Sequence, residues 1–233
     1  SLATWSMGSA TVYFTGGGAQ SLSYSEVNNT GFGAVKVNKT LATTLTLSGN
    51  GTSTGAFTIE SGTFSGGSSI FRVGGNFSVN ESGTFTPSTG TIEFNGSGAQ
   101  SVSSTNFAVL TINKSGGTVT PLVNTTSTGN FSLLGGTLSL GTKAFDVGGN
   151  FIVNGGVFTP GTATTTLNGS GAQSVSSTAF MGLVIDGGTV TFTGDTTSTA
   201  GVKVMSGSLS LGTNRLNIGG DFVVNGGTFT PGT

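Results

Sequence analysis

GGNFIVNGGVFTPGT, residues 148–162, is the most informative stretch of the chain, because near copies of it occur earlier and later. Residues 74–89 read GGNFSVNESGTFTPST, and residues 219–233 read GGDFVVNGGTFTPGT. A second block, GAQS, also recurs; its glutamines are Gln20, Gln100 and Gln173. The blocks follow one another in the same order at a spacing of about 73 residues, so the chain is an internal repeat protein.

Between these blocks, short runs of alternating apolar and polar residues end at Gly-Gly, Asn-Gly, Ser-Gly or Asp-Gly, as in TVTFTGD at residues 189–195. Alternation with period two predicts β-strands, and these dipeptides predict turns. No window of eleven or more residues has a helical period. We therefore predict an all-β chain made of many very short strands.

Such a pattern favours a single-stranded parallel β-solenoid (a β-helix), which we expect to be right-handed, with about three long repeats of roughly 73 residues. In a solenoid the inward residues of each coil stack on those of the next, while outward positions accept Thr and Ser. Coils of about 18–25 residues would give about ten coils. A β-sandwich or a row of small β-domains is the alternative, but neither requires a sequence repeat.

The repeats divide the chain into a solenoid over residues 9–233 and a short leading segment, residues 1–8. We place the three repeats at about 9–89, 90–162 and 163–233. The leading segment contains the only Trp of the chain and one of its three Met. We predict that it is a docking strand between subunits.

Both ends of the sequence fall at the same phase of the repeat, because residues 3–9 resemble residues 227–233. Open solenoid ends expose unpaired strand edges, which recruit other strands unless they are covered. We therefore predict that the two ends bind each other head to tail; the alternative is that the chain is an excerpt of a longer repeat protein. The predicted interface residues are Trp5, Met7, Val12, Phe14, Phe222, Val224, Phe229 and Pro231.

Composition excludes several function classes. The chain has no His and no Cys, so Ser-His-Asp and Cys-His catalysis, the usual zinc ligands and disulfides are ruled out. Only 7 basic residues are present against 8 acidic ones, which argues against a nucleic-acid partner. The acidic residues do not recur in phase, and no apolar run is long enough for a membrane span. We expect no enzymatic activity, no catalytic or metal-binding residue and no cofactor.

Asn-x-Ser/Thr triplets are frequent, and turn chemistry alone accounts for many of them. They are nevertheless candidate glycosylation sites if the protein is exported by a glycosylating organism. The candidate residues are Asn28, Asn38, Asn50, Asn76, Asn80, Asn95, Asn113, Asn124, Asn130 and Asn168.

The blocks NGSGAQSV, LTINKSGGTV and GGNFxVNGGxFTPGT resemble the β-helical repeat regions of prokaryotic cell-surface and secreted proteins, among them adhesin-like and fibre-forming proteins. This resemblance implies an extracellular or cell-surface location. We predict a structural subunit of an extracellular filament, whose partner is another copy of itself. An adhesin stalk or a carbohydrate-binding solenoid from a larger surface protein, with surface glycans or other cells as partners, is the alternative.

Overall fold

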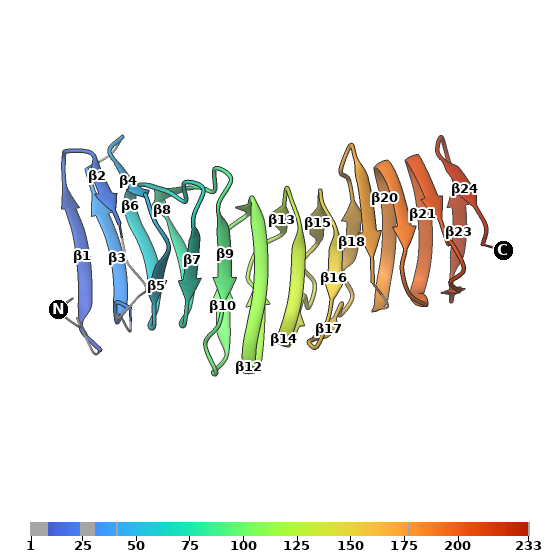
Figure 1. Ribbon diagram of the computed structural model, residues 1–233, viewed down its shortest axis with the longest axis horizontal. Coiled ribbons are helices and arrows are strands. Elements are labelled where there is room, and N and C mark those ends of the chain that lie inside the picture. The colour runs from blue at the N-terminus through green and yellow to red at the C-terminus, as the bar shows by residue number, and fades with distance from the viewer. Residues whose placement is uncertain (1–8, 24–30, 41, 177, 233) are drawn as a thin grey trace.

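The strands of this protein pair in parallel and follow one another along a single axis (Figure 1). The computed structural model describes residues 9–23, 31–40, 42–176 and 178–232, and no helix occurs among them. The chain forms a parallel β-solenoid of about eleven coils, so the predicted fold class is confirmed. The first described strand and the last strand lie at opposite ends of the rod (Figure 1).

Each coil runs along three faces, which we name A, B and C in the order in which the chain meets them. Face A contains β1 (Thr11–Gly16), β3 (Ala34–Lys39), the first parts of β6 (Phe57–Ser65) and β8 (Phe77–Thr86), β10 (Gln100–Val102), the second parts of β12 (Val109–Pro121) and β14 (Phe131–Ser139), β17 (Val157–Thr159), the first parts of β20 (Thr178–Phe192) and β21 (Thr196–Ser210), and β22 (Leu216–Ile218).

Faces B and C follow in the same way. Face B contains β2 (Gln20–Leu22), β4 (Thr44–Leu47), the second parts of β6 and β8, β11 (Asn106–Phe107), β13 (Thr125–Ser127), β15 (Phe145–Val147), β18 (Thr164–Leu167), the middle parts of β20 and β21, and β23 (Asp221–Val224). Face C begins at Phe32 and contains β5 (Gly51–Ser53), β7 (Ile70–Val73), β9 (Thr91–Phe94), the first parts of β12 and β14, β16 (Phe151–Val153), β19 (Ala172–Val175), the last parts of β20 and β21, and β24 (Thr228–Thr230).

The core is built from columns of inward side chains that run parallel to the axis. On face B the strand register stacks Val147, Leu167, Ile185 and Val204 one above the other, and all four are fully buried. Alternate residues on the same strands point outward, because successive side chains of a strand face opposite sides. The alternating pattern of the sequence therefore separates the core from the surface coil by coil.

Several strands are longer than the sequence pattern predicts. β12 has 13 residues, and β20 and β21 have 15 each, because their ladders continue through the corners between faces. Register shifts mark these corners, for example between Ile185 and Asp186. The glycine dipeptides thus bend a strand at many corners without ending it.

Close approach of neighbouring coils explains the glycine of the Asn-Gly-Ser-Gly corner. A Cβ atom at Gly96 would lie 1.9 Å from the carbonyl oxygen of Gly74, and one at Gly169 would lie 1.9 Å from that of Gly148. Only glycine fits at such a distance.

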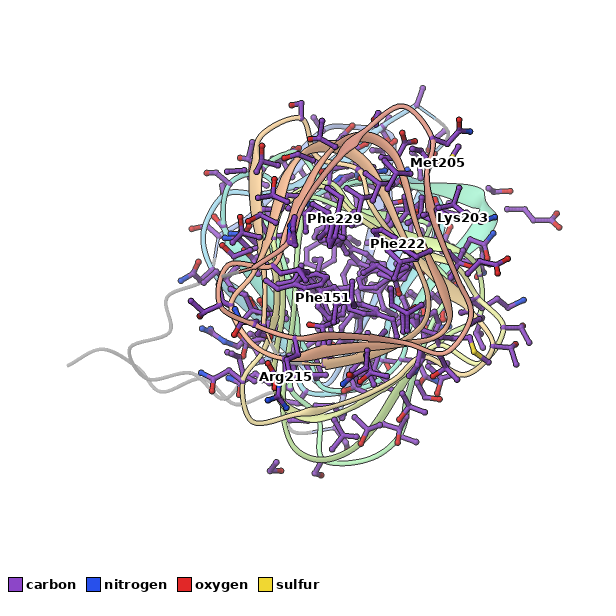
Figure 2. All side chains as sticks on the ribbon, turned by 90° about the vertical axis from the view of Figure 1, so that its right-hand side faces the viewer. Phe151, Lys203, Met205, Arg215, Phe222 and Phe229 are labelled. Atoms are coloured by element: carbon purple, nitrogen blue, oxygen red, sulfur yellow. The ribbon has the colours of Figure 1, made fainter. Side chains whose placement is uncertain are left out.

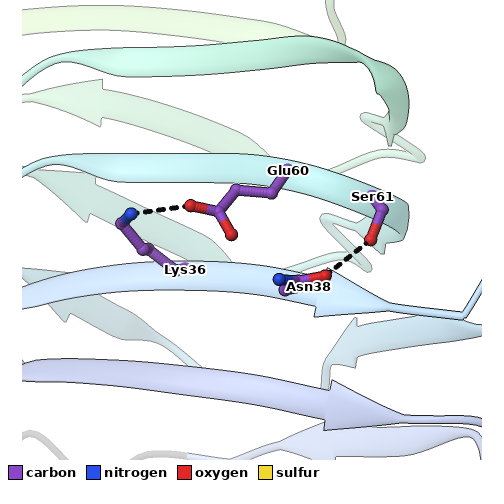
Figure 3. Close-up of polar contacts among 4 residues, drawn as sticks. All are labelled: Lys36, Asn38, Glu60 and Ser61. Carbon is purple, nitrogen blue, oxygen red and sulfur yellow. Dashed lines mark hydrogen bonds and ion pairs between the residues drawn. The ribbon is translucent and has the colours of Figure 1, made fainter.

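Outward side chains add polar contacts between adjacent coils (Figure 3). Lys36 Nζ on β3 lies 2.6 Å from Glu60 Oε1 on β6, and Ser61 Oγ donates to Asn38 Oδ1 at 2.9 Å. The hydrogen bond to Glu60 is the main cause that raises the pKa of Lys36. Exposed pairs of this kind contribute little to stability.

Matching segments of the three repeats do not lie on the same face. Residues 9–89, 90–162 and 163–233 contain β1–β8, β9–β17 and β18–β24, respectively. Each segment crosses eleven faces, or three and two-thirds coils, so their first strands β1, β9 and β18 fall on faces A, C and B. Each repeat is therefore rotated by one face from the one before it, and three repeats together return to face A.

Candidate assembly surface at the two ends of the solenoid

The last coil exposes the inward columns of the core. Phe222 follows the fully buried Val202 in its column, and Val224 follows the fully buried Val204. Yet Phe222 is 38% exposed and Val224 is 43% exposed. Among the residues that the structure describes, no coil covers β22, β23 and β24 on their outer side, which leaves these two side chains exposed.

Figure 2 looks onto this end of the rod. The rings of Phe222 and Phe229 point into the interior, whereas Lys203 and Arg215 point away from it (Figure 2). The two ring centroids are 4.8 Å apart in an edge-to-face arrangement. The end therefore presents an apolar centre with a polar rim, which is the usual composition of a protein interface.

The first described coil presents the complementary edge of the core. Val12 and Phe14 on β1 point inward and are only partly buried, although they pack against the core on one side. Phe32 completes this coil on face C and contacts Phe14 edge-to-face, with the ring centroids 6.5 Å apart. The described solenoid thus leaves apolar residues partly exposed at both ends, Val12 and Phe14 on face A of the first described coil and Phe222 and Val224 on face B of the last, whereas Phe32 is buried at 8% exposure.

The predicted interface residues fall into two groups. Phe222, Val224, Phe229 and Pro231 lie in the last coil, where Phe229 is partly buried and Pro231 is exposed. Val12 and Phe14 lie in the first described coil, at the opposite end of the rod. Trp5 and Met7, with the rest of the predicted docking strand at residues 1–8, lie outside the described residues. The chain therefore does not bring the two groups together by itself.

The recurring glutamines bind backbone groups of the preceding coil. Gln100 Nε2 donates to the carbonyl oxygen of Val73 at 2.8 Å and to that of Gly75. Gln173 Nε2 makes the equivalent bonds to Val147, at 2.9 Å, and to Gly149. Both side chains are 2% exposed. In these two copies the recurring glutamine is therefore a buried amide that backbone groups satisfy.

Two buried lysines accompany the glutamines, and the sequence pattern did not reveal them. Lys39 Nζ donates to Gln20 Oε1 at 2.9 Å, and Lys114 Nζ donates to Gln100 Oε1. Their side chains are only 1% and 4% exposed, respectively. Burial lowers the pKa of Lys114. Both follow the run Val-Asn or Ile-Asn at the end of an alternating strand, which was the only signal available.

Asparagine and aspartate oxygens at the corners accept hydrogen bonds from backbone N–H groups of the next coil. Asn130 Oδ1 accepts from the N–H of Asn150 at 2.8 Å, and Asn150 Oδ1 accepts from that of Ser174 at 2.7 Å. These side chains therefore extend the backbone ladder around the corner.

Nine of the ten candidate glycosylation residues are described, and Asn28 lies outside the described residues. Seven of the nine are exposed, whereas Asn50 and Asn95 are half-buried. The side-chain oxygens of Asn50, Asn76, Asn124 and Asn130 each accept a backbone hydrogen bond. Glycosylation of any of them stays a prediction.

Within the described ranges, no group of three or more His, Cys, Asp or Glu residues is placed to hold a metal ion. In the same part of the chain, no helix is long and apolar enough to cross a membrane. The chain matches no family model, and its comparisons with curated proteins and with solved structures give no match either.

Proposed function

We propose that this protein is a structural subunit that polymerises head to tail, so that the solenoid of one copy continues into the next. The observation that carries the proposal is the exposure of the inward columns at the last coil, at Phe222 and Val224. In every earlier coil of face B from β13 onward, residues at these positions are buried.

Two kinds of interaction favour this contact. The apolar residues of the end coils leave water, which stabilises association by about 25 cal/mol per Å² of apolar surface. The free backbone groups of the terminal strands form a parallel ladder, which fixes direction. Because the two surfaces differ, the contact is heterologous and does not close, so it produces an open filament.

The resemblance of the repeated blocks to prokaryotic cell-surface and secreted proteins supports an extracellular or cell-surface setting. In this proposal the role is structural and not catalytic, and the principal partner is another copy of the chain.

Two neighbouring valines on β23 provide a matched test. Val224 points inward and is 43% exposed, whereas Val223 points outward and is 38% exposed. Val224→Asp places a carboxylate against the apolar column of the neighbouring copy, and burying an unpaired charge costs several kcal/mol. We expect the dissociation constant to rise more than a hundredfold, which corresponds to about 2.8 kcal/mol. Val223→Asp leaves the contact unchanged.

Sedimentation velocity across a wide range of protein concentrations measures this difference, and circular dichroism checks that both variants are folded. Assembly by the unmodified chain and by Val223→Asp, with loss in Val224→Asp, supports the proposal. If the folded unmodified chain sediments as a monomer throughout, the proposal is wrong.

A stalk or carbohydrate-binding solenoid within a larger surface protein is the second candidate. Two matching hollows favour it, with volumes of about 310 and 370 Å³. One is lined by Thr52, Thr54, Gly74, Asn95, Gly96, Ser97 and Gly98, and the other by Thr126, Thr128, Gly148, Asn168, Gly169, Ser170 and Gly171. Hydroxyl and amide groups of this kind hydrogen-bond to sugars. Binding of the chain to a glycan array, lost when Asn95 and Asn168 are replaced by Leu, would support this candidate.

A further inference from the structure

We propose that two copies join in one defined register, with β1 of one copy over β22 of the other, β2 over β23, and Phe32 over Phe229, and without rotation about the axis. This inference rests on the head-to-tail assembly proposed above and adds the geometry of the joint. It is argued from junctions that the chain already makes inside itself.

The chain passes twice from one repeat into the next, and both passages have the same contacts. In the first, β7 pairs with β9 over four residues; in the second, β15 pairs with β18 over three. Each passage then has one isolated pair, Phe77 with Val102 and Phe151 with Val175. A third passage of this kind would start from the last coil, which consists of β22, β23 and β24. In the proposed joint the next copy makes this passage.

An aromatic group marks each passage. Phe85 and Phe107 contact across the first, with ring centroids 5.9 Å apart, and Phe158 and Phe180 contact across the second at 5.8 Å. No strand ladder joins these residues, so the rings bridge the two coils. In the third repeat, Phe229 is the equivalent of Phe85 and Phe158, and in the proposed joint the ring that contacts it comes from the next copy.

Phe32 is the residue that fits this place. Phe107 pairs with Ser127 in the following coil, Phe180 pairs with Ser198, and Phe32 pairs with Ser53. The three phenylalanines therefore hold the same position relative to the coil that follows them. Phe32 lies on face C of the first described coil, and Phe229 lies on face C of the last. A second copy stacked without rotation brings Phe229 to the position of Phe32, which is 8% exposed and contacts Phe14 of its own coil.

Gln20 supplies the polar part of the joint. Gln100 and Gln173 donate to the carbonyls of the preceding Val-Gly-Gly segment, and both are buried. Gln20 is exposed, and the equivalent segment, Ile218-Gly219-Gly220, lies on the last coil. In the proposed register the Gln20 amide donates to the carbonyls of Ile218 and Gly220 in the neighbouring copy.

Two further hydrogen bonds have the same precedent. The oxygens of Asn76 and Asn150 accept from the N–H groups of Ser101 and Ser174 across the two internal passages. Asp221 stands at this position in the third repeat, and Ser21 is the corresponding donor in the first described coil. The proposed register brings the Asp221 carboxylate onto the Ser21 N–H of the next copy.

The absence of rotation follows from the geometry of the repeats. Each repeat crosses eleven faces and turns the motif by one face, so three repeats complete a whole number of coils. A copy that continues the pattern therefore begins on face A, where β1 lies in the first copy. Eleven coils at about 4.8 Å each give an axial rise of about 53 Å per copy.

The chain contains no cysteine, so engineered disulfides can test the register without interference. In the proposed joint, Tyr13 of one copy stands directly over Asn217 of the other, as Glu93 stands over Arg72 within the chain. Paired residues on adjacent strands are close enough for a disulfide. The double variant Tyr13→Cys with Asn217→Cys should form covalent multimers on mild oxidation, seen as a ladder on a denaturing gel.

Two control variants represent a rotated joint. Tyr13→Cys with Val223→Cys crosslinks if β1 lies over face B, and Tyr13→Cys with Thr230→Cys crosslinks if it lies over face C. A ladder from the Asn217 pair alone supports the inference. A ladder from either control pair, with sedimentation still showing assembly, overturns the register but leaves head-to-tail assembly intact. No ladder from any pair, with a monomer in sedimentation, overturns both.

The matched pair Gln20→Ala and Gln173→Ala separates the joint from the fold. Gln20→Ala should weaken assembly at least tenfold, and it should also lower monomer stability because it removes the acceptor of the buried Lys39. Gln173→Ala should lower the midpoint of denaturant unfolding and leave the assembly constant unchanged. Equal effects of the two variants on assembly would contradict the hydrogen bonds proposed for Gln20.

Discussion

Val204 and Val224 occupy the same column of face B one coil apart, yet Val204 is fully buried and Val224 is 43% exposed. The glutamines repeat the comparison, because Gln100 and Gln173 are buried and Gln20 is exposed. In both comparisons the residue type is the same and the coverage by a neighbouring coil differs. Burial in this fold is thus decided by what lies above and below a residue along the axis.

The coils of a solenoid enclose the core on every side around the axis, but along the axis each coil is covered only by its neighbours. An inward side chain is covered by the coils on both sides of it, and among the described residues the last coil has such a neighbour on one side only. The two passages between repeats show how one repeat packs on the next, and the proposed joint between copies has the same contacts. Variants that compare an interior position with its counterpart at the end therefore separate stability from assembly.

The largest expected effect comes from the phenylalanines. Phe151 is fully buried, so Phe151→Ala should lower the free energy of unfolding by about 3–5 kcal/mol. Phe222 holds the same motif position but is 38% exposed, so Phe222→Ala should lower it by less than half as much in the monomer. Denaturant unfolding at low protein concentration measures both. Equal losses would show that the end coil is packed like the interior.

An intermediate effect is expected at the corner residues. Asn150→Ala removes the acceptor for the Ser174 N–H and should lower the free energy of unfolding by about 1 kcal/mol. Asp221→Ala changes the equivalent position on the last coil and should leave the monomer unaffected. Thermal unfolding of the two variants under identical conditions checks this. A loss of similar size in Asp221→Ala would mean that Asp221 has a stabilising partner within its own chain.

The smallest effect is a gradual pH dependence from the buried lysine. Burial lowers the pKa of Lys114 below its ordinary value of 10.5, so the unfolded chain binds the proton more tightly than the folded one. Stability from this group therefore rises with pH from the lowered pKa to about 10.5. Denaturant unfolding of the native chain and of Lys114→Met is measured from neutral to alkaline pH. The free energy of unfolding of the native chain should rise relative to that of the variant as the pH increases.

Lys36 is the contrasting surface case. Its pKa is raised, chiefly by the hydrogen bond to Glu60, so its contribution to stability is present below 10.5 and is lost above that pH. The stability of a Lys36→Met variant should therefore still rise with pH because of Lys114, whereas Lys114→Met should lack this rise. If the free energies of unfolding of Lys114→Met and of the native chain differ by the same amount at every pH, burial does not lower the pKa of Lys114.

Much of the fold was predictable from sequence because local chemistry specifies it. Runs such as residues 189–193 alternate strictly, and glycine dipeptides mark the corners, so an all-β solenoid follows from the residues themselves. The rotation of each repeat by one face was not predictable. The coil length varies, with paired residues 17 positions apart at Ala172 and Thr189 but 25 apart at Phe77 and Val102, so the number of coils in a repeat cannot be counted from the chain.

The candidate site was predictable only in part. Phe222, Val224 and Phe229 were identified because they repeat the apolar positions of earlier blocks. Gln20 was recognised as a recurring residue, but its exposure depends on the packing of neighbouring coils and could not be seen in the motif. Lys39 and Lys114 were missed because a lysine that ends a strand usually points to solvent.

Electron microscopy of the purified chain, with helical reconstruction, tests most directly whether the two ends of the solenoid bind each other. We predict unbranched filaments one solenoid wide, with an axial rise of about 53 Å per copy and no rotation between copies. Separate particles of 22.9 kDa at every protein concentration would contradict the claim.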